Sequence, residues 1–203
     1  MLYPRYPVSR RQPGFTGPFY APPPAFPESQ VIGRRYGVRL SDNPHNMANV
    51  LEVPFSAISL TKRETSDVGQ ITIASARNWM ADITDRADNL VQVYRTNIRR
   101  DGSLDEDELA LLLIDTINSY FGGRSSSITL SMRSDRVYTG AGAWTAEGVS
   151  YQAERAGRSV VRCRIIPKLS PLDTLTFGAL SFVVGYATFV ISLQGSIWVE
   201  AGE

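Results

Sequence analysis

The segment Asn97 to Glu108, NIRRDGSLDEDE, has the length and the central glycine of a calcium-binding loop. With Gly102 in the sixth position, oxygen-bearing side chains fall in the first, fifth, ninth and twelfth positions. These are Asn97, Asp101, Asp105 and Glu108. Arg99 occupies the third position, where a ligand oxygen is required and a cation repels the ion. We therefore expect no metal site here.

A single histidine and a single cysteine limit the other kinds of active site. His45 has no Gly-x-Ser-x-Gly sequence to accompany it, which excludes a serine hydrolase triad of that type. Cys163 has no disulfide partner, and the two residues are too few for a zinc site. Gly140 and Gly142 lack the third glycine of a dinucleotide fingerprint, so they predict a turn or a β-bulge. We expect neither enzyme activity nor a cofactor.

Short strands and one helix are predicted on the N-terminal side of the calcium-like segment. Residues 50–60 indicate a strand that is interrupted at Pro54, because proline cannot donate to a sheet ladder. Residues 70–76 and 90–95 alternate as strands do. Residues 78–87 predict a helix of two to three turns.

Two structures fit the sequence that follows Asp101-Gly102. Ser103 and Glu106 have the spacing of a helix capping box, and apolar residues recur at helical spacing through residues 109–121. The same residues, followed by glycines and by residues 127–132, fit a β-hairpin equally well. The sequence leaves helix and strand open here.

The C-terminal third organises the chain. Leu175 to Val199 contains no charged side chain, but its glycines and β-branched residues favour strands over a membrane helix. We expect an antiparallel meander with alternate residues buried, packed on a hairpin formed by residues 151–166. Its three strands are predicted at residues 173–177, 180–190 and 192–199.

Residues 1–35 are predicted to form an extended arm. Eight of the twelve prolines lie in the first 30 residues, which excludes a helix or an interior strand there. Aromatic and basic side chains alternate with the prolines, and we expect them to bind a partner. These candidate partner-binding residues are Tyr3, Arg5, Tyr6, Arg10, Arg11, Phe15, Phe19, Tyr20 and Phe26. The alternative is a solvated tail.

The net charge of +1 gives no indication of nucleic-acid binding. Residues 1–40 nevertheless carry six arginines against one glutamate, so the remaining chain is net negative. The predicted body comprises residues 46–203, as one unit or as two subdomains at about 46–100 and 101–203.

The element order and two motifs resemble β-barrel proteins of tailed-bacteriophage tail tips and baseplate hubs. In that family an "ITIAS" strand precedes a short helix and an "LVQVYR" strand, as residues 71–75 and 90–95 do here. Residues 160–165 are similar to an "RVRV" strand, and Leu172-Asp173-Thr174 stands where such proteins often have Gly-Asp-Thr. The resemblance covers about residues 46–203.

This resemblance implies a mainly β (α+β) fold, an antiparallel β-barrel or sandwich with one or two short helices. It also implies a structural protein of the virion, in a tail tip, hub or connector ring, made in the host cytoplasm. Its partners would be other copies of itself and neighbouring tail proteins, with no small-molecule substrate, no sequence-specific nucleic acid and no membrane span.

Two other classes stay open from the sequence. A virus capsid jelly roll with a basic N-terminal arm also suits an all-β body, and eight even strands without the helix at residues 78–87 would favour it. A membrane-anchored protein would use residues 175–199 as its span.

Overall fold

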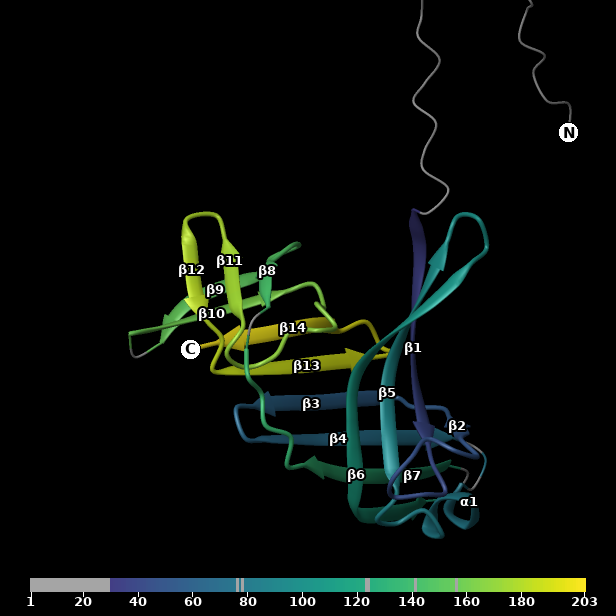
Figure 1. Ribbon diagram of the computed structural model, residues 1–203. Helices are drawn as coiled ribbons and strands as arrows, with labels where there is room; N and C mark the ends of the chain where they lie inside the picture. Colours follow the sequence, from purple (N-terminus) through teal and green to yellow (C-terminus); the bar gives the residue numbers. More distant parts are fainter. Residues whose placement is uncertain (1–29, 76, 78, 123–124, 141, 156) are drawn as a thin grey trace, which may run out of the picture.

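The computed structural model describes residues 30–75, 77, 79–122, 125–140, 142–155 and 157–203 (Figure 1). In these residues the chain forms fourteen strands and one short helix, α1 (Met80–Thr84). The prediction of a mainly antiparallel β body with a short helix is confirmed.

Eleven strands form one sheet in which all neighbours are antiparallel. The sheet has two ends and is not closed, so the body is sandwich-like. In spatial order the strands are β2 (Leu51–Val53), β1 (Val31–Leu40), β5 (Leu90–Arg99), β6 (Leu104–Gly122), β7 (Ser125–Ser134), β4 (Ser66–Ser75), β3 (Ala57–Arg63), β13 (Tyr186–Ser192), β14 (Ile197–Gly202), β10 (Arg158–Cys163) and β9 (Tyr151–Arg155).

The large sheet changes direction along β6, which is 19 residues long. The first part of β6 pairs with β5 and its last part pairs with β7, with a register shift in each pairing. Figure 1 shows β1, β5 and β6 standing upright across β3, β4, β13 and β14. The apolar faces of the upright and the crossing strands enclose one core. It includes Val38, Leu40, Val91 and Val93 from the upright strands and Ile58, Leu60, Ile71 and Phe189 from the crossing strands.

A second sheet of three strands covers one end of the body. Its order is β12 (Leu180–Val183), β11 (Thr174–Phe177) and β8 (Ala143–Thr145), and β8 and β11 are parallel.

The buried carboxylate of Asp173 holds this second sheet in place. Its oxygens accept bonds from Gly142 N at 2.8 Å, Trp144 Nε1 at 2.9 Å and Ser170 N at 2.9 Å. A Cβ on Gly142 would lie 2.6 Å from Asp173 Oδ1, so only glycine allows this approach. Gly142 thus allows a close approach of the Asp173 carboxylate, whereas the turn or β-bulge expected there stays a prediction.

The C-terminal region has four strands where three were predicted. The expected strand at residues 180–190 divides at Gly185, where a Cβ would lie 2.8 Å from the backbone of Glu203. Its first half, β12, joins the small sheet, whereas β13 and β14 join the large one. The predicted packing on the hairpin of β9 and β10 is confirmed, because β14 pairs with β10.

The structure also gives the length of the predicted helix and the conformation of residues 109–121. The predicted helix at 78–87 is shorter, because the chain turns after Thr84 and reaches a left-handed φ of 63° at Asp88. Residues 109–121 are strand, so the hairpin alternative is correct and the helical one is wrong. Ser103 N binds Asp101 Oδ1 in a turn instead of capping a helix.

The described strands begin earlier than the predicted body. β1 starts at Val31, so residues 31–35, assigned to the arm by the sequence, lie inside the large sheet. That sheet also joins residues 46–100 with residues 101–203, because β3 pairs with β13. Among the described residues no helix has the length and apolar character to span a membrane.

Candidate interaction surface

The predicted partner-binding residues all lie outside the described part of the chain. They are Tyr3, Arg5, Tyr6, Arg10, Arg11, Phe15, Phe19, Tyr20 and Phe26. Their role therefore stays a prediction.

The calcium-like segment comprises the end of β5, the turn at residues 100–103 and the start of β6, and arginines pair with several of its acids. Arg99 Nη2 lies 3.0 Å from Asp105 Oδ2, and Arg95 Nη2 lies 2.6 Å from Asp107 Oδ2. Gln92 Nε2 donates to Glu108 Oε2 at 3.1 Å. Within the described ranges, no group of three or more His, Cys, Asp or Glu side chains is arranged to hold a metal ion. Cross-strand pairing explains this acidic run.

The single histidine and the single cysteine lie in different parts of the fold. His45 is exposed in the loop between β1 and β2. Cys163 is buried on β10, where burial raises the pKa of its thiol to about 11. A thiol with so high a pKa stays protonated near neutral pH and is a poor nucleophile.

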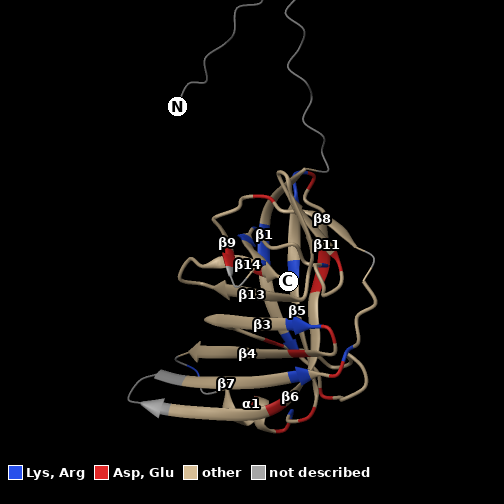
Figure 2. Cartoon of the chain, turned by 90° about the vertical axis from the view of Figure 1, so that its left-hand side faces the viewer, with Lys and Arg blue, Asp and Glu red and all other residues tan. Residues whose placement is uncertain are grey.

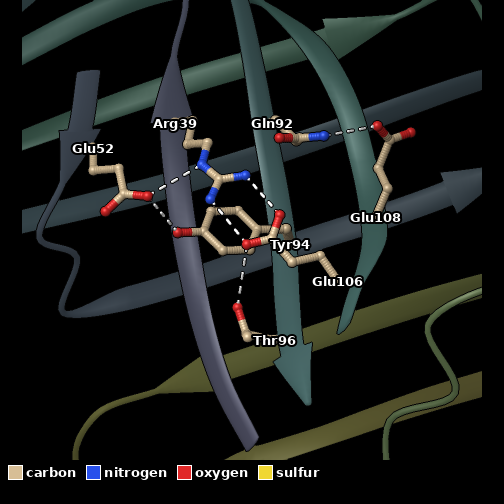
Figure 3. A network of polar contacts seen from close by, with 7 residues as sticks. All are labelled: Arg39, Glu52, Gln92, Tyr94, Thr96, Glu106 and Glu108. Carbon is tan, nitrogen blue, oxygen red and sulfur yellow. Dashed lines mark hydrogen bonds and ion pairs between the residues drawn. The ribbon is translucent and has the colours of Figure 1, made fainter. Parts of the chain in front are cut away.

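A polar network covers the outer face of β2, β1, β5 and β6 (Figure 3). Arg39 Nη1 and Nη2 donate to the two carboxylate oxygens of Glu106 at 2.8 and 2.9 Å. Arg39 Nε donates to Glu52 Oε1 at 3.1 Å, and Tyr94 Oη donates to the same oxygen at 3.0 Å. The guanidinium lies 3.9 Å from the centre of the Tyr94 ring. One arginine thus connects four strands.

Hydrogen bonding and burial determine the electrostatics of this network. The hydrogen bond from Arg39 lowers the pKa of Glu106, and pairing with Glu106 raises the pKa of Arg39. Burial, and then the hydrogen bond to Glu52, raises the pKa of Tyr94. Arg39 and Glu106 therefore stay charged near neutral pH, and the Tyr94 hydroxyl keeps its proton. Figure 2 shows basic and acidic stretches side by side on β1, β5 and β6.

A groove lies beside this network, where β2 ends. β2 pairs only with residues 38–40 of β1, so within the described part of the chain residues 31–37 of β1 have no strand on that side. The groove has a volume of about 380 Å³ and is lined by Tyr36, Gly37, Val38, Glu52, Val53, Pro54, Phe55, Tyr94 and Leu193. Its lining is mainly aromatic and aliphatic, with one carboxylate.

Gly37 allows the Tyr94 ring to lie over β1. A Cβ at this position would come within 2.3 Å of Tyr94 Oη and Cζ. The ring would have to move, and its contacts with Arg39 and Glu52 would be lost.

We expect Gly37→Ala to lower the free energy of unfolding by about 1 to 2 kcal/mol, because the displaced ring loses its hydrogen bond and its packing. Gly33→Ala is the matched control on the same strand, where the added Cβ meets Ile98 Cδ1 at an ordinary 3.4 Å. Urea unfolding of both variants measures the difference. Equal stabilities would show that Gly37 is not required for the position of the Tyr94 ring.

A second, more polar groove of about 560 Å³ lies at the other end of β13. It is lined by Thr61, Arg63, Glu64, Thr65, Arg158, Gly185, Tyr186, Thr188 and Glu203. The lining contains neither cysteine nor histidine, so it offers no thiol or imidazole for nucleophilic catalysis.

Lys62, Asp67 and Tyr138 form a buried polar cluster between β3 and β4. Tyr138 Oη donates to Asp67 Oδ2 at 2.7 Å, and Lys62 Nζ donates to Leu169 O at 3.3 Å. Burial lowers the pKa of Lys62 to about 8 and raises that of Asp67. Neither groove is lined by these three side chains. The cluster anchors the segment after β7, since Tyr138 N also donates to Glu64 O at 3.1 Å.

The amino-acid sequence alone did not predict the outer-face network or the groove. Arg39, Glu52, Tyr94 and Glu106 are distant in sequence, and each looks like an ordinary outward residue of an alternating strand. Only the pairing register places Arg39 opposite Glu52 and Gly37 opposite Tyr94. The interruption at Pro54 was the one available signal, because it marks the end of β2.

Comparison with known proteins relies on structure alone. No family model matches the sequence, and no curated protein matches it significantly. A solved tail protein from Neisseria meningitidis MC58 superposes with a TM-score of 0.50 at 6% identity, over 84% of this chain and 96% of that chain. The two chains share a fold.

Two further solved structures are similar to parts of the chain. The 43 kDa tail protein of prophage MuSo2 from Shewanella oneidensis gives a TM-score of 0.49 at 6% identity, covering 84% of this chain and 96% of that chain. The half-lidded Francisella PdpA-VgrG complex gives 0.34 at 8% identity, over 51% of this chain and 18% of that one.

Proposed function

We propose that this protein is a structural, non-enzymatic component of a bacteriophage tail, forming part of a tail tip, hub or connector ring. The observation that carries the proposal is the fold shared with the Neisseria tail protein, which extends over 84% of this chain. The sequence resemblance to tail-tip and hub proteins supports the same role. Virion localisation follows from this role.

The arrangement of the described residues supports a binding role over a catalytic one. The acids of β6 pair with arginines, and the outer face carries a fixed charged network beside a groove. Such a face suits contact with other copies of this chain and with neighbouring tail proteins. The jelly-roll alternative expected eight even strands without a helix at residues 78–87, whereas eleven strands share one sheet and α1 lies in that range.

In this proposal the N-terminal arm holds each subunit to its neighbour. The first 29 residues are too rich in proline to bury their own aromatic side chains in a core. Contact with an adjacent subunit buries those side chains and adds contact area to a symmetric or mixed ring.

Deleting residues 1–29 is expected to weaken assembly and to leave the melting temperature nearly unchanged, because the described sheet begins only at Val31. Light scattering coupled to size exclusion measures the assembly, and calorimetry measures the melting. A full-length chain with Arg5, Arg10 and Arg11 changed to Gln is the control for the electrostatic attraction of the arm, which salt screens. This chain should retain most of the assembly. If the truncated chain assembles as well as the full one, the arm does not hold neighbouring subunits together.

A further inference from the structure

The groove beside Tyr94 has the surface chemistry of a site for proline-rich peptide. Three aromatic residues line it: Tyr36 is partly buried, and Phe55 and Tyr94 present only an edge, at 7% and 8% exposed. Pro54 and the side chain of Leu193, which is 71% exposed, complete the apolar lining. Aromatic grooves bind polyproline II segments because the ligand is already extended and loses little entropy on docking.

Glu52 adds a charge preference to this groove. Its two contacts, from Arg39 and Tyr94, both use Oε1, and its side chain is 65% exposed. Oε2 is therefore able to accept a hydrogen bond from an incoming cation. A proline-rich ligand with an arginine next to its prolines fits this groove better than a neutral one.

The N-terminal segment of this chain contains one such ligand. In Pro4-Arg5-Tyr6-Pro7 the two prolines are three residues apart, so in a polyproline II helix, with its three residues per turn, they would lie on one face. Arg5 lies between them. Pro24-Ala25-Phe26-Pro27 has the same proline spacing but no arginine.

The length of the chain favours the groove of a neighbouring copy. Figure 1 shows that β1 begins at the end of the upright strands, beyond the crossing strands. From Pro7 to Val31 an extended polyproline II chain spans roughly 70 Å at about 3.1 Å per residue. Tyr36 lies only about 17 Å along β1 from Val31. A stiff segment would have to double back over most of its length to reach its own groove.

We infer that Pro4–Pro7 of one copy docks in the groove of the next copy, with Arg5 bound to Glu52 and the prolines against the aromatic rings. This inference rests on the proposed role of the arm in holding neighbouring subunits together, and it specifies the site of that contact.

Disulfide trapping between full-length chains tests the inference, because the only native cysteine, Cys163, is buried. A Val8→Cys chain is mixed with a Leu193→Cys chain and oxidised, and mass spectrometry identifies the crosslinked peptides. Docking should give roughly tenfold more mixed dimer than Val8→Cys with Val68→Cys, since docking raises the effective concentration. Val68, on β4, is 46% exposed and does not line the groove.

Charge variants test the Arg5–Glu52 contact in the same assay. Arg5→Gln and Glu52→Gln should each lower the yield of mixed dimer about two- to fivefold, as for an exposed ion pair. Glu52→Gln keeps an oxygen that accepts from Tyr94. Arg10→Gln is the matched control, and it should lower the yield less than Arg5→Gln because it removes only the screened attraction of the arm. Equal losses from Arg5→Gln and Arg10→Gln would overturn this pairing.

Three results would overturn the docking itself. Equal yields with the Leu193 and Val68 partners would exclude the groove. A chain that carries both Val8→Cys and Leu193→Cys and forms mainly an intrachain bond would place the arm on its own subunit. Light scattering of the wild-type protein is run in parallel. An assembled wild type without trapping rejects the inference alone, whereas a protein that stays monomeric rejects the proposed assembly as well.

Discussion

Val184→Asp is expected to lower the free energy of unfolding by about 3 to 5 kcal/mol, because it buries an unpaired carboxylate. The Val184 side chain is 0% exposed in the core cluster. Its backbone is also fixed, since Val184 N donates to Asp173 O at 2.8 Å and Val184 O accepts from Leu172 N at 2.7 Å. A loss of this size approaches the whole stability of many domains.

Val183→Asp is the matched control one residue earlier. Val183 is 54% exposed, so its carboxylate stays in water and should cost less than about 1 kcal/mol. Urea unfolding followed by tryptophan fluorescence measures both variants. Similar losses for the two would mean that Val184 does not face the core.

The sequence predicted strands in this region but not which valine is buried. A single strand over residues 180–190 would place Val184 and Val190 on the same face, because alternate residues share a face. Gly185 divides the segment, and β13 then has its own alternation, in which Ala187, Phe189 and Ile191 are buried. Val190 is only partly buried as a result. The position of a break in a strand therefore determines which residues on either side of the break face the core.

Leu172 shows a different limit of sequence reasoning. Leu172 has a φ of 68°, in the left-handed region that glycine adopts freely and a leucine occupies at a cost of about 1 kcal/mol or more. The resemblance placed glycine in the same position. The sequence thus marked a turn before Asp173, but its leucine gave no indication of the backbone conformation.

The candidate surface was less predictable than the fold, because it depends on pairing between distant strands. Periodicity finds strands from local residues, whereas Arg39 and Glu106 meet only when β1, β5 and β6 pair in one register. The bulge at Val93 and Tyr94 shifts that register. No pattern within a single strand contains this information.

Lys62 is expected to make the protein more stable as the pH rises from 8 toward 10. Its side chain is almost fully buried, near the Phe189 ring, and burial lowers its pKa from 10.5 to about 8, with Asp67 opposing and Arg136 reinforcing that shift. Between these two values the folded state binds fewer protons than the unfolded state, so the free energy of unfolding increases with pH. The penalty for burying the cation is complete below pH 8, shrinks as the pH rises and is gone only above the unfolded value of 10.5.

The expected gain is about 1 to 3 kcal/mol between pH 7 and pH 10, from the difference between the two pKa values. Lys62→Met is the control, because it removes the titrating group and keeps an apolar side chain of similar length. Tyr138 and Tyr94 have raised pKa values and destabilise the fold as the pH rises above 10, so the comparison ends there. Both proteins are unfolded with urea at each pH, and the wild type should gain stability relative to the variant. Parallel profiles for the two proteins would mean that Lys62 keeps its ordinary pKa in the folded state.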